Sequence, residues 1–120
     1  MKISKELEIA VEKLCEDINK AHFDQFPNLT EYNTYPSYAG QKYIKIITDT
    51  GNQKSVWGFI NAKEFKKGLA GITFLEGDIL KAAGWKTPAL NAPRGNILRA
   101  PYPIIGMRQY GPDYLKWVLQ

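Results

Sequence analysis

The chain has 120 residues and a formal net charge of +4, a length that suits one ordinary domain. Hydrophobic residues make up 44% and charged residues 23%, which excludes a disordered chain, a collagen-like fibre and a disulfide scaffold. Cys15 is the single cysteine, so no intramolecular disulfide can form. Apolar runs are short and residues 1–20 carry charge throughout, so we expect a single domain over residues 1–120 with no membrane span.

An amphipathic helix is predicted over residues 5–22. Ser4 is a favoured N-cap residue, and His22 suits the negative end of the helix dipole. No glycine or proline interrupts the span. Apolar residues recur at the three- and four-residue spacing of one helical face: Leu7, Val11, Leu14, Ile18 and Ala21.

Residues 23–40 predict an ordered loop, because turn formers are mixed there with aromatic residues that we expect to pack on a sheet. A hairpin is predicted over residues 42–61, where two β-branched and aromatic runs flank a turn. Strict alternation places Trp57 and Phe59 on one face of the second strand. Gly58 falls on the other face and indicates either a bulge or close packing by another element.

Shorter elements follow. We expect a helical turn or loop over residues 62–71, then strand segments over 72–75 and 78–83. Prolines beyond Gly84 exclude a central strand, so mostly irregular chain is expected there. A final short helix is predicted over residues 112–119.

Together these elements predict an α+β fold. One long N-terminal helix packs on a small antiparallel sheet, made of the hairpin over residues 42–61 plus a strand near residues 78–83. An extended, Pro-rich C-terminal segment closes the domain.

The positive charge is concentrated in the second half of the chain. Residues 1–76 contain ten lysines and ten acidic residues, whereas residues 77–120 contain six basic and two acidic residues. All three arginines lie between positions 94 and 108, among tyrosines, tryptophans and prolines. Basic residues interleaved with aromatic ones can neutralise a nucleic-acid backbone and stack on its bases. The same composition also suits an extended segment that wraps the core, with arginine stems lying over aromatic anchors.

Residues with catalytic or metal-binding chemistry are sparse. His22 is the single histidine, and Cys15 lies about 10 Å from it along the predicted helix, too far for a direct hydrogen bond. We interpret Cys15 as a small buried residue and His22 as a helix-end cation or a satisfied polar residue. No metal-ligand spacing or nucleotide-binding glycine loop is present, so we expect no enzyme activity, no metal and no cofactor.

One long motif is distinctive. The sequence reads GDILKAAGWKTPA over residues 77–89 and APRGN over residues 92–96, and it is preceded by SVWGFI at 55–60 and followed by GPDYL at 111–115. It resembles a family of small uncharacterised proteins encoded by tailed bacteriophages, although the connector over residues 61–76 is longer than that family's. The resemblance implies a phage origin and the cytoplasm of an infected bacterium, and it implies no activity, cofactor or catalytic residue.

Two functions are compatible with these patterns. The first is a non-enzymatic binding domain whose basic, aromatic C-terminal half contacts an anion, foremost nucleic acid. The second is a protein-interaction or virion-associated module that binds a phage or host protein or forms a homo-oligomer. A hydrolase or an inhibitor of a host defence would need a pocket that the sequence does not reveal. The candidate anion-binding residues are Lys81, Trp85, Lys86, Arg94, Asn96, Arg99 and Arg108.

The motif also has a purely structural interpretation. In that case residues 78–80 form the last strand, Trp85 fills the core, and residues 94–96 form a turn in which Arg94 binds backbone carbonyls. For Trp85 we favour the structural interpretation, and for Lys81 and Lys86 both remain open.

Overall fold

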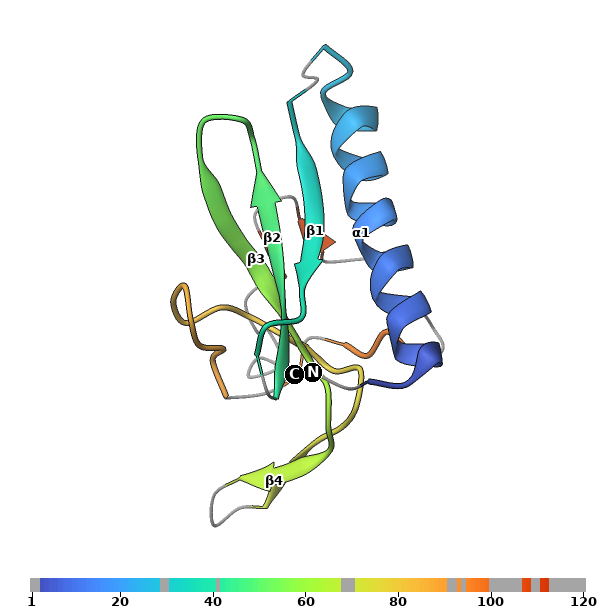
Figure 1. Cartoon of the computed structure of the whole chain (residues 1–120), viewed down its shortest axis with the longest axis vertical. Helices are drawn as coiled ribbons and strands as arrows, with labels where there is room; N and C mark the ends of the chain where they lie inside the picture. The colour runs from blue at the N-terminus through green and yellow to red at the C-terminus, as the bar shows by residue number, and fades with distance from the viewer. Residues whose placement is uncertain are drawn as a thin grey trace, which may run out of the picture.

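A helix and a small antiparallel sheet make up the fold, as the sequence predicts (Figure 1). The computed structural model describes residues 3–28, 31–40, 42–67, 71–90, 93, 95–99, 107–108 and 111–112. The elements in chain order are α1 (Lys5–Gln25), β1 (Asn33–Ser37), β2 (Tyr43–Asp49), β3 (Lys54–Asn61), β4 (Phe65–Lys67), β5 (Ile72–Phe74), β6 (Ile79–Leu80), β7 (Met107–Arg108) and β8 (Gly111–Pro112). The main sheet has the strand order β1-β2-β3-β6, and β4-β5 and β7-β8 form separate two-stranded pairs.

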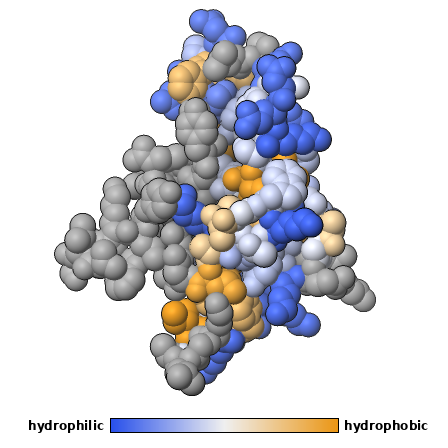
Figure 2. All heavy atoms as spheres, turned by 90° about the vertical axis from the view of Figure 1, so that its left-hand side faces the viewer, coloured by the Kyte–Doolittle hydropathy of each residue, from blue (hydrophilic) through white to orange (hydrophobic). Residues whose placement is uncertain are grey.

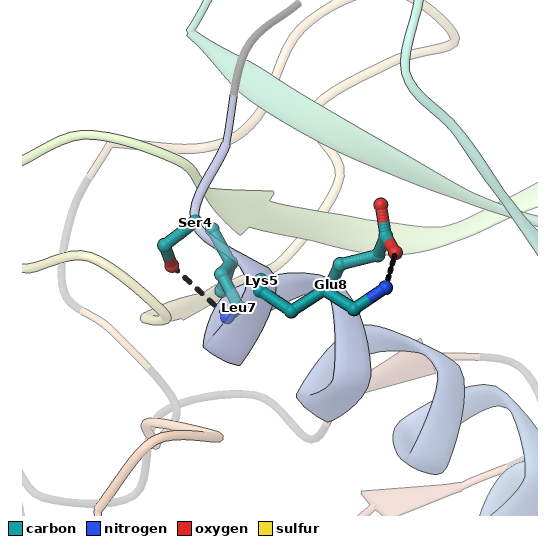
Figure 3. Close-up of polar contacts among 4 residues, drawn as sticks. All are labelled: Ser4, Lys5, Leu7 and Glu8. Carbon is teal, nitrogen blue, oxygen red and sulfur yellow. Dashed lines mark hydrogen bonds and ion pairs between the residues drawn. The ribbon is translucent and has the colours of Figure 1, made fainter.

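Helix α1 begins where the sequence predicts and runs three residues beyond His22, to Gln25. The Ser4 hydroxyl accepts a hydrogen bond from the Leu7 amide at 3.0 Å, which satisfies one of the free donors of the first turn (Figure 3). Lys5 and Glu8 form an ion pair on the exposed side of the same turn (Figure 3). Four residues of the predicted apolar stripe are buried against one face of the sheet, Leu7, Val11, Leu14 and Ile18, whereas the fifth, Ala21, is exposed.

Strand β1 corrects the expectation of a loop over residues 23–40. Its five residues pair antiparallel with β2, and Thr34 lies opposite Thr48 with their hydroxyl oxygens 3.3 Å apart. The Asn19 side chain of α1 accepts from the Thr34 amide at 2.7 Å and donates to the Thr34 carbonyl. Pro36 lowers the strand signal, yet proline is compatible with a strand at the edge of a sheet. The sequence pattern therefore did not predict this strand, which is hydrogen-bonded to Asn19 of α1.

The hairpin over residues 42–61 is confirmed as β2 and β3, with a bulge opposite Ile46 and Ile47. Gly58 pairs with Ile46 and Val56 pairs with Ile47, so Trp57 is the extra residue. The expectation that Trp57 and Phe59 share one face is therefore wrong. Trp57 packs in the core under α1, whereas Phe59 belongs to a second apolar cluster.

The connector between β3 and β6 corrects a second expectation. Residues 62–71 were predicted as a helical turn or loop, but Phe65–Lys67 forms β4 and pairs with β5 as a small hairpin. This hairpin extends below the main sheet in Figure 1. The Phe65 and Phe74 rings stack with their centroids 5.0 Å apart, so aromatic packing holds it together.

The last strand of the main sheet is shorter than predicted. Pairing with β3 is limited to Ile79 and Leu80 of the segment over residues 78–83. The strand pair β7-β8 follows, and β8 lies beside β3. Pro112 lies in β8 and not in the first turn of a helix, while residues 113–119 of the predicted helix lie outside the described residues.

Candidate nucleic-acid interface

The motif over residues 77–89 leads out of β6 into a tight loop. The Ala89 amide donates to the Lys81 carbonyl at 2.7 Å, and Ala82 and Pro88 form a β-bridge. At the tip, the amides of Ala83 and Gly84 both donate to the Thr87 carbonyl. This segment, called here the 81–89 loop, is drawn in gold on the left of Figure 1. Its backbone is closed at both the base and the tip, which gives it a defined shape.

Trp85 lies exposed at the tip of the 81–89 loop. Its side chain is 47% exposed, so the interpretation of Trp85 as a residue that fills the core is wrong. The Lys45 ammonium lies 4.3 Å from the centroid of the Trp85 ring, within the range of a cation–π interaction. Lys45 projects from β2 on the face opposite α1, because its neighbours Ile44 and Ile46 lie in the core under the helix. A lysine of the sheet and a tryptophan of the loop thus meet across about forty residues of sequence.

The other candidate residues of the loop differ in their exposure. Lys86 is exposed next to Trp85, and Lys81 is half-buried at the base of the loop. Arg99 is exposed at the end of a turn over residues 96–99, in which its amide donates to the Asn96 carbonyl. Arg94 lies outside the described residues, and Arg108 is described only by its backbone in β7.

Asn96 has a structural environment. It is buried, and its side-chain amide donates to an Asp78 carboxylate oxygen and to the Glu76 carbonyl, both at 2.9 Å. Its side-chain oxygen accepts from the Leu98 amide at 2.8 Å. Both the nitrogen and the oxygen of the Asn96 side chain are hydrogen-bonded, and little of its surface is exposed, so Asn96 connects the two parts of the motif. It is therefore not counted among the candidate contact residues.

Two lysines of the sheet region, Lys45 and Lys42, are not among the candidate residues predicted from the sequence. Lys42 precedes β2, and its ammonium lies 5.8 Å from the Phe65 ring centroid. The one available signal was a lysine between isoleucines in a strand, which marks a position on the face away from the helix.

A comparison with known protein families identifies the family to which the chain belongs. The family described as "Family of unknown function (DUF7717)" matches residues 1–102. The chain belongs to this family. No curated protein and no solved structure matches it. The span shared with the DUF7717 family includes the 81–89 loop and Asn96, whereas β7 and β8 lie beyond it.

Reactive side chains in this DUF7717 chain are held in the core. Cys15 is buried, and this burial, assisted by the charges of Glu12 and Glu16, raises the pKa of its thiol to about 12. His22 is buried as well and stacks on Tyr32 with ring centroids 3.6 Å apart, so it packs among aromatic rings and is not exposed at the helix end. Neither side chain lies at the exposed Trp85 loop.

Two classes of feature are absent from the described part of this DUF7717 chain. Its described residues hold no group of three or more acidic, histidine or cysteine side chains that could bind a metal ion. No helix among them combines the length and the apolar character needed to cross a bilayer.

Proposed function

We propose that this chain is a small non-enzymatic domain that binds nucleic acid. The contact surface is formed by Lys45, Trp85 and Lys86 and is called here the Trp85 surface. Its central observation is the 4.3 Å contact between the Lys45 ammonium and the Trp85 ring. A fixed, exposed aromatic ring flanked by cations combines the two groups that bind nucleic acid independently of sequence: charges for phosphates and a π-face for bases.

The distribution of charge supports this proposal. The exposed outer side of α1 carries ion pairs, including Lys13 with Asp17 and Lys20 with Asp24, so its positive charge is locally balanced. Lys86, in contrast, follows Trp85 in a stretch of the chain with an excess of basic residues. We therefore expect a polyanion to be attracted to Lys45 and Lys86 of the Trp85 surface more than to the ion-paired lysines of α1.

Fluorescence anisotropy with the full chain tests this proposal. Labelled single-stranded DNA, duplex DNA and RNA are titrated at about 50 and 200 mM salt. The affinity is expected to fall with salt, and Lys45→Ala/Lys86→Ala is expected to lower it further. On a single strand, losing two phosphate contacts reduces the slope of log affinity against log salt by about 1.4.

A charge-matched variant is the control. Lys5→Ala/Lys20→Ala also removes two positive charges, both from exposed positions on α1, away from the Trp85 surface. It is expected to keep the parental salt slope. The proposal fails if no probe binds at the lower salt concentration, or if the two double variants lose affinity equally.

A protein-interaction module is the second candidate, and a different observation favours it. Ile72 of the β4-β5 hairpin is 38% exposed, and Figure 2 shows apolar residues gathered at the lower end of this side of the molecule, where Figure 1 places the hairpin. Exposed apolar residues close together mark protein contacts. A homo-oligomer, or a phage or host protein bound with little salt dependence, is expected in that case. Light scattering coupled to size-exclusion chromatography, with Ile72→Ser as the variant, tests the homo-oligomer.

The resemblance of the motif over residues 77–96 to proteins of tailed bacteriophages supports a further proposal, that the chain is phage-encoded and acts in the cytoplasm of an infected bacterium. Detection of the protein by mass spectrometry in infected cells, and not in uninfected ones, is the expected result. Its presence in uninfected, phage-free cells would contradict this origin.

A further inference from the structure

The Trp85 ring is exposed at the tip of a loop that backbone hydrogen bonds close. Hydrogen bonds at the base and tip of the 81–89 loop fix the backbone on both sides of Trp85. The Lys45 ammonium lies over the ring, yet 47% of the side chain stays exposed. Because the ring is already held in place, a partner that stacks on it loses little affinity to ordering the protein.

We infer that Trp85 is a stacking platform for an unpaired nucleobase, so that the ligand class is single-stranded nucleic acid. This inference rests on the proposed nucleic-acid binding and narrows it. In a duplex both faces of each base are already stacked on neighbouring bases, and inserting a side chain costs a few kcal/mol of unstacking for each step. A single strand offers its base faces without that cost.

The neighbouring charges fit the same geometry. Lys45 lies at the ring itself and the exposed Lys86 follows Trp85 directly, so we expect two ammonium groups to be available to the phosphates of a strand whose base stacks on Trp85. Both groups are flexible point charges that bind phosphate without demanding one orientation. Every base has a π-face, so the site is expected to accept any base.

Three probes of equal length separate stacking from charge. They are a deoxythymidine strand of about twelve nucleotides, the corresponding duplex, and a strand of the same length in which every base is replaced by an abasic site. The abasic strand keeps the phosphates and removes the stacking partner. Base-to-aromatic stacking is worth about 1–3 kcal/mol, so the base-bearing strand is expected to bind about 5- to 150-fold more tightly than the abasic one.

Variants assign the effect to one ring. Trp85→Ala is expected to lower affinity for the base-bearing strand to that for the abasic strand, and to leave abasic binding unchanged. Trp85→Phe keeps an aromatic face and is expected to retain part of the preference. Ile9→Ala removes another exposed apolar side chain, on α1, and is the matched control, with parental binding expected. Circular dichroism spectra establish that each variant is folded.

The outcomes distinguish this inference from the proposed function. If no probe binds, both are overturned. If all three probes bind with equal affinity and a steep salt dependence, the domain binds nucleic acid but Trp85 is not a stacking platform. A duplex preference, or a Trp85→Ala variant that still discriminates against the abasic strand, likewise overturns the inference alone.

Discussion

The side-chain amide of Asn96 lies 2.9 Å from a carboxylate oxygen of Asp78, and both residues are buried. The second oxygen of this carboxylate accepts from the Leu75 amide at 2.7 Å. A backbone bridge also joins Asp78 to Asn96, and the Ile97 amide donates to the Gly77 carbonyl. The two parts of the distinctive motif are therefore one structural unit, in which the strand end and the later turn hold each other.

Asn96→Ala is expected to reduce the free energy of unfolding by about 2–3 kcal/mol, because the hydrogen bond from the Asn96 side chain to a buried carboxylate is lost. Asn96→Asp is expected to cost more, since it places a second negative charge beside Asp78. Urea unfolding measures both effects. Asn52→Ala, at an exposed position in the β2-β3 turn, is the control and is expected to change stability by less than about 0.5 kcal/mol. Equal losses of stability in Asn52→Ala and Asn96→Ala would contradict a stabilising role for the buried hydrogen bond.

A glycine series separates backbone strain from crowding. Gly77 has a φ of 89°, and a Cβ there would lie 2.9 Å from both the Asn96 side-chain oxygen and Leu98 Cγ. Gly71 has a φ of 67° with no atom near the added Cβ, and Gly84 has neither constraint. We expect Gly84→Ala to be nearly neutral, Gly71→Ala to cost about 1–2 kcal/mol, and Gly77→Ala to cost more. Thermal unfolding gives the order, and a reversed order of Gly71 and Gly77 would contradict the crowding argument.

The elements that the sequence predicted well are those in which one physical pattern dominates. Helix α1 has an uninterrupted apolar stripe and a capping serine, and the hairpin over residues 42–61 has two β-branched runs around a turn. Strand β1 was missed because its pairing depends on contacts with β2 and on Asn19 of α1, which lie outside its own five residues. The assignment of Trp57 and Phe59 to one face failed because the bulge inserts one residue and shifts the alternation.

Stability is expected to fall at alkaline pH because of Cys15. In the folded chain the pKa of the thiol is raised from 9.0 to about 12. Burial is the largest cause, and the charges of Glu12 and Glu16 add to it. The unfolded chain therefore releases this proton at lower pH, so the stability contribution is complete below about pH 9 and is lost as pH rises toward 12. The slope steepens above pH 9 and approaches about 1.4 kcal/mol for each pH unit between the two pKa values.

Urea unfolding between about pH 8.5 and 10 tests this slope. Cys15→Ala is expected to flatten the dependence on pH, whatever cost the smaller side chain has at neutral pH. Burial also raises the pKa of Tyr38, from 10.0 to about 12, and the pKa of Tyr43, so the comparison with Cys15→Ala identifies the part of the slope that belongs to the thiol. An unchanged slope in Cys15→Ala would assign the alkaline loss to other groups.

The Ser4 cap provides a local test of α1. Ser4→Ala is expected to cost about 1 kcal/mol, because the Leu7 amide loses its acceptor. Ser4→Asp keeps an acceptor and suits the helix dipole, but the Ser4 hydroxyl lies 3.3 Å from a Glu76 carboxylate oxygen, so the new charge meets an existing one. Ser4→Asp/Glu76→Gln is therefore expected to be more stable than Ser4→Asp. Thermal unfolding decides, and Ser55→Ala, at an exposed position of β3, is the control.

The candidate site was only partly predictable. Trp85 and Lys86 follow directly from the motif, whereas their position at an exposed tip depends on the backbone closure between Lys81 and Ala89. The contact of Trp85 with Lys45 brings together residues about forty positions apart, and no local pattern encodes that distance. Asn96 was assigned to the site by its place in the motif, but a polar residue in a motif can equally satisfy a buried carboxylate.

The contact between Asn19 and Thr34 has a consequence for assembly. An edge strand normally offers unpaired amides and carbonyls to which another chain can add a strand. Here the helix asparagine accepts from the Thr34 amide and donates to the Thr34 carbonyl, the two groups that an added strand would need. Pro36, two residues along, has no amide hydrogen to offer. The outer backbone groups of β1 at these two positions are therefore not available to an added strand, and we expect this edge not to extend the sheet into a second copy of the chain.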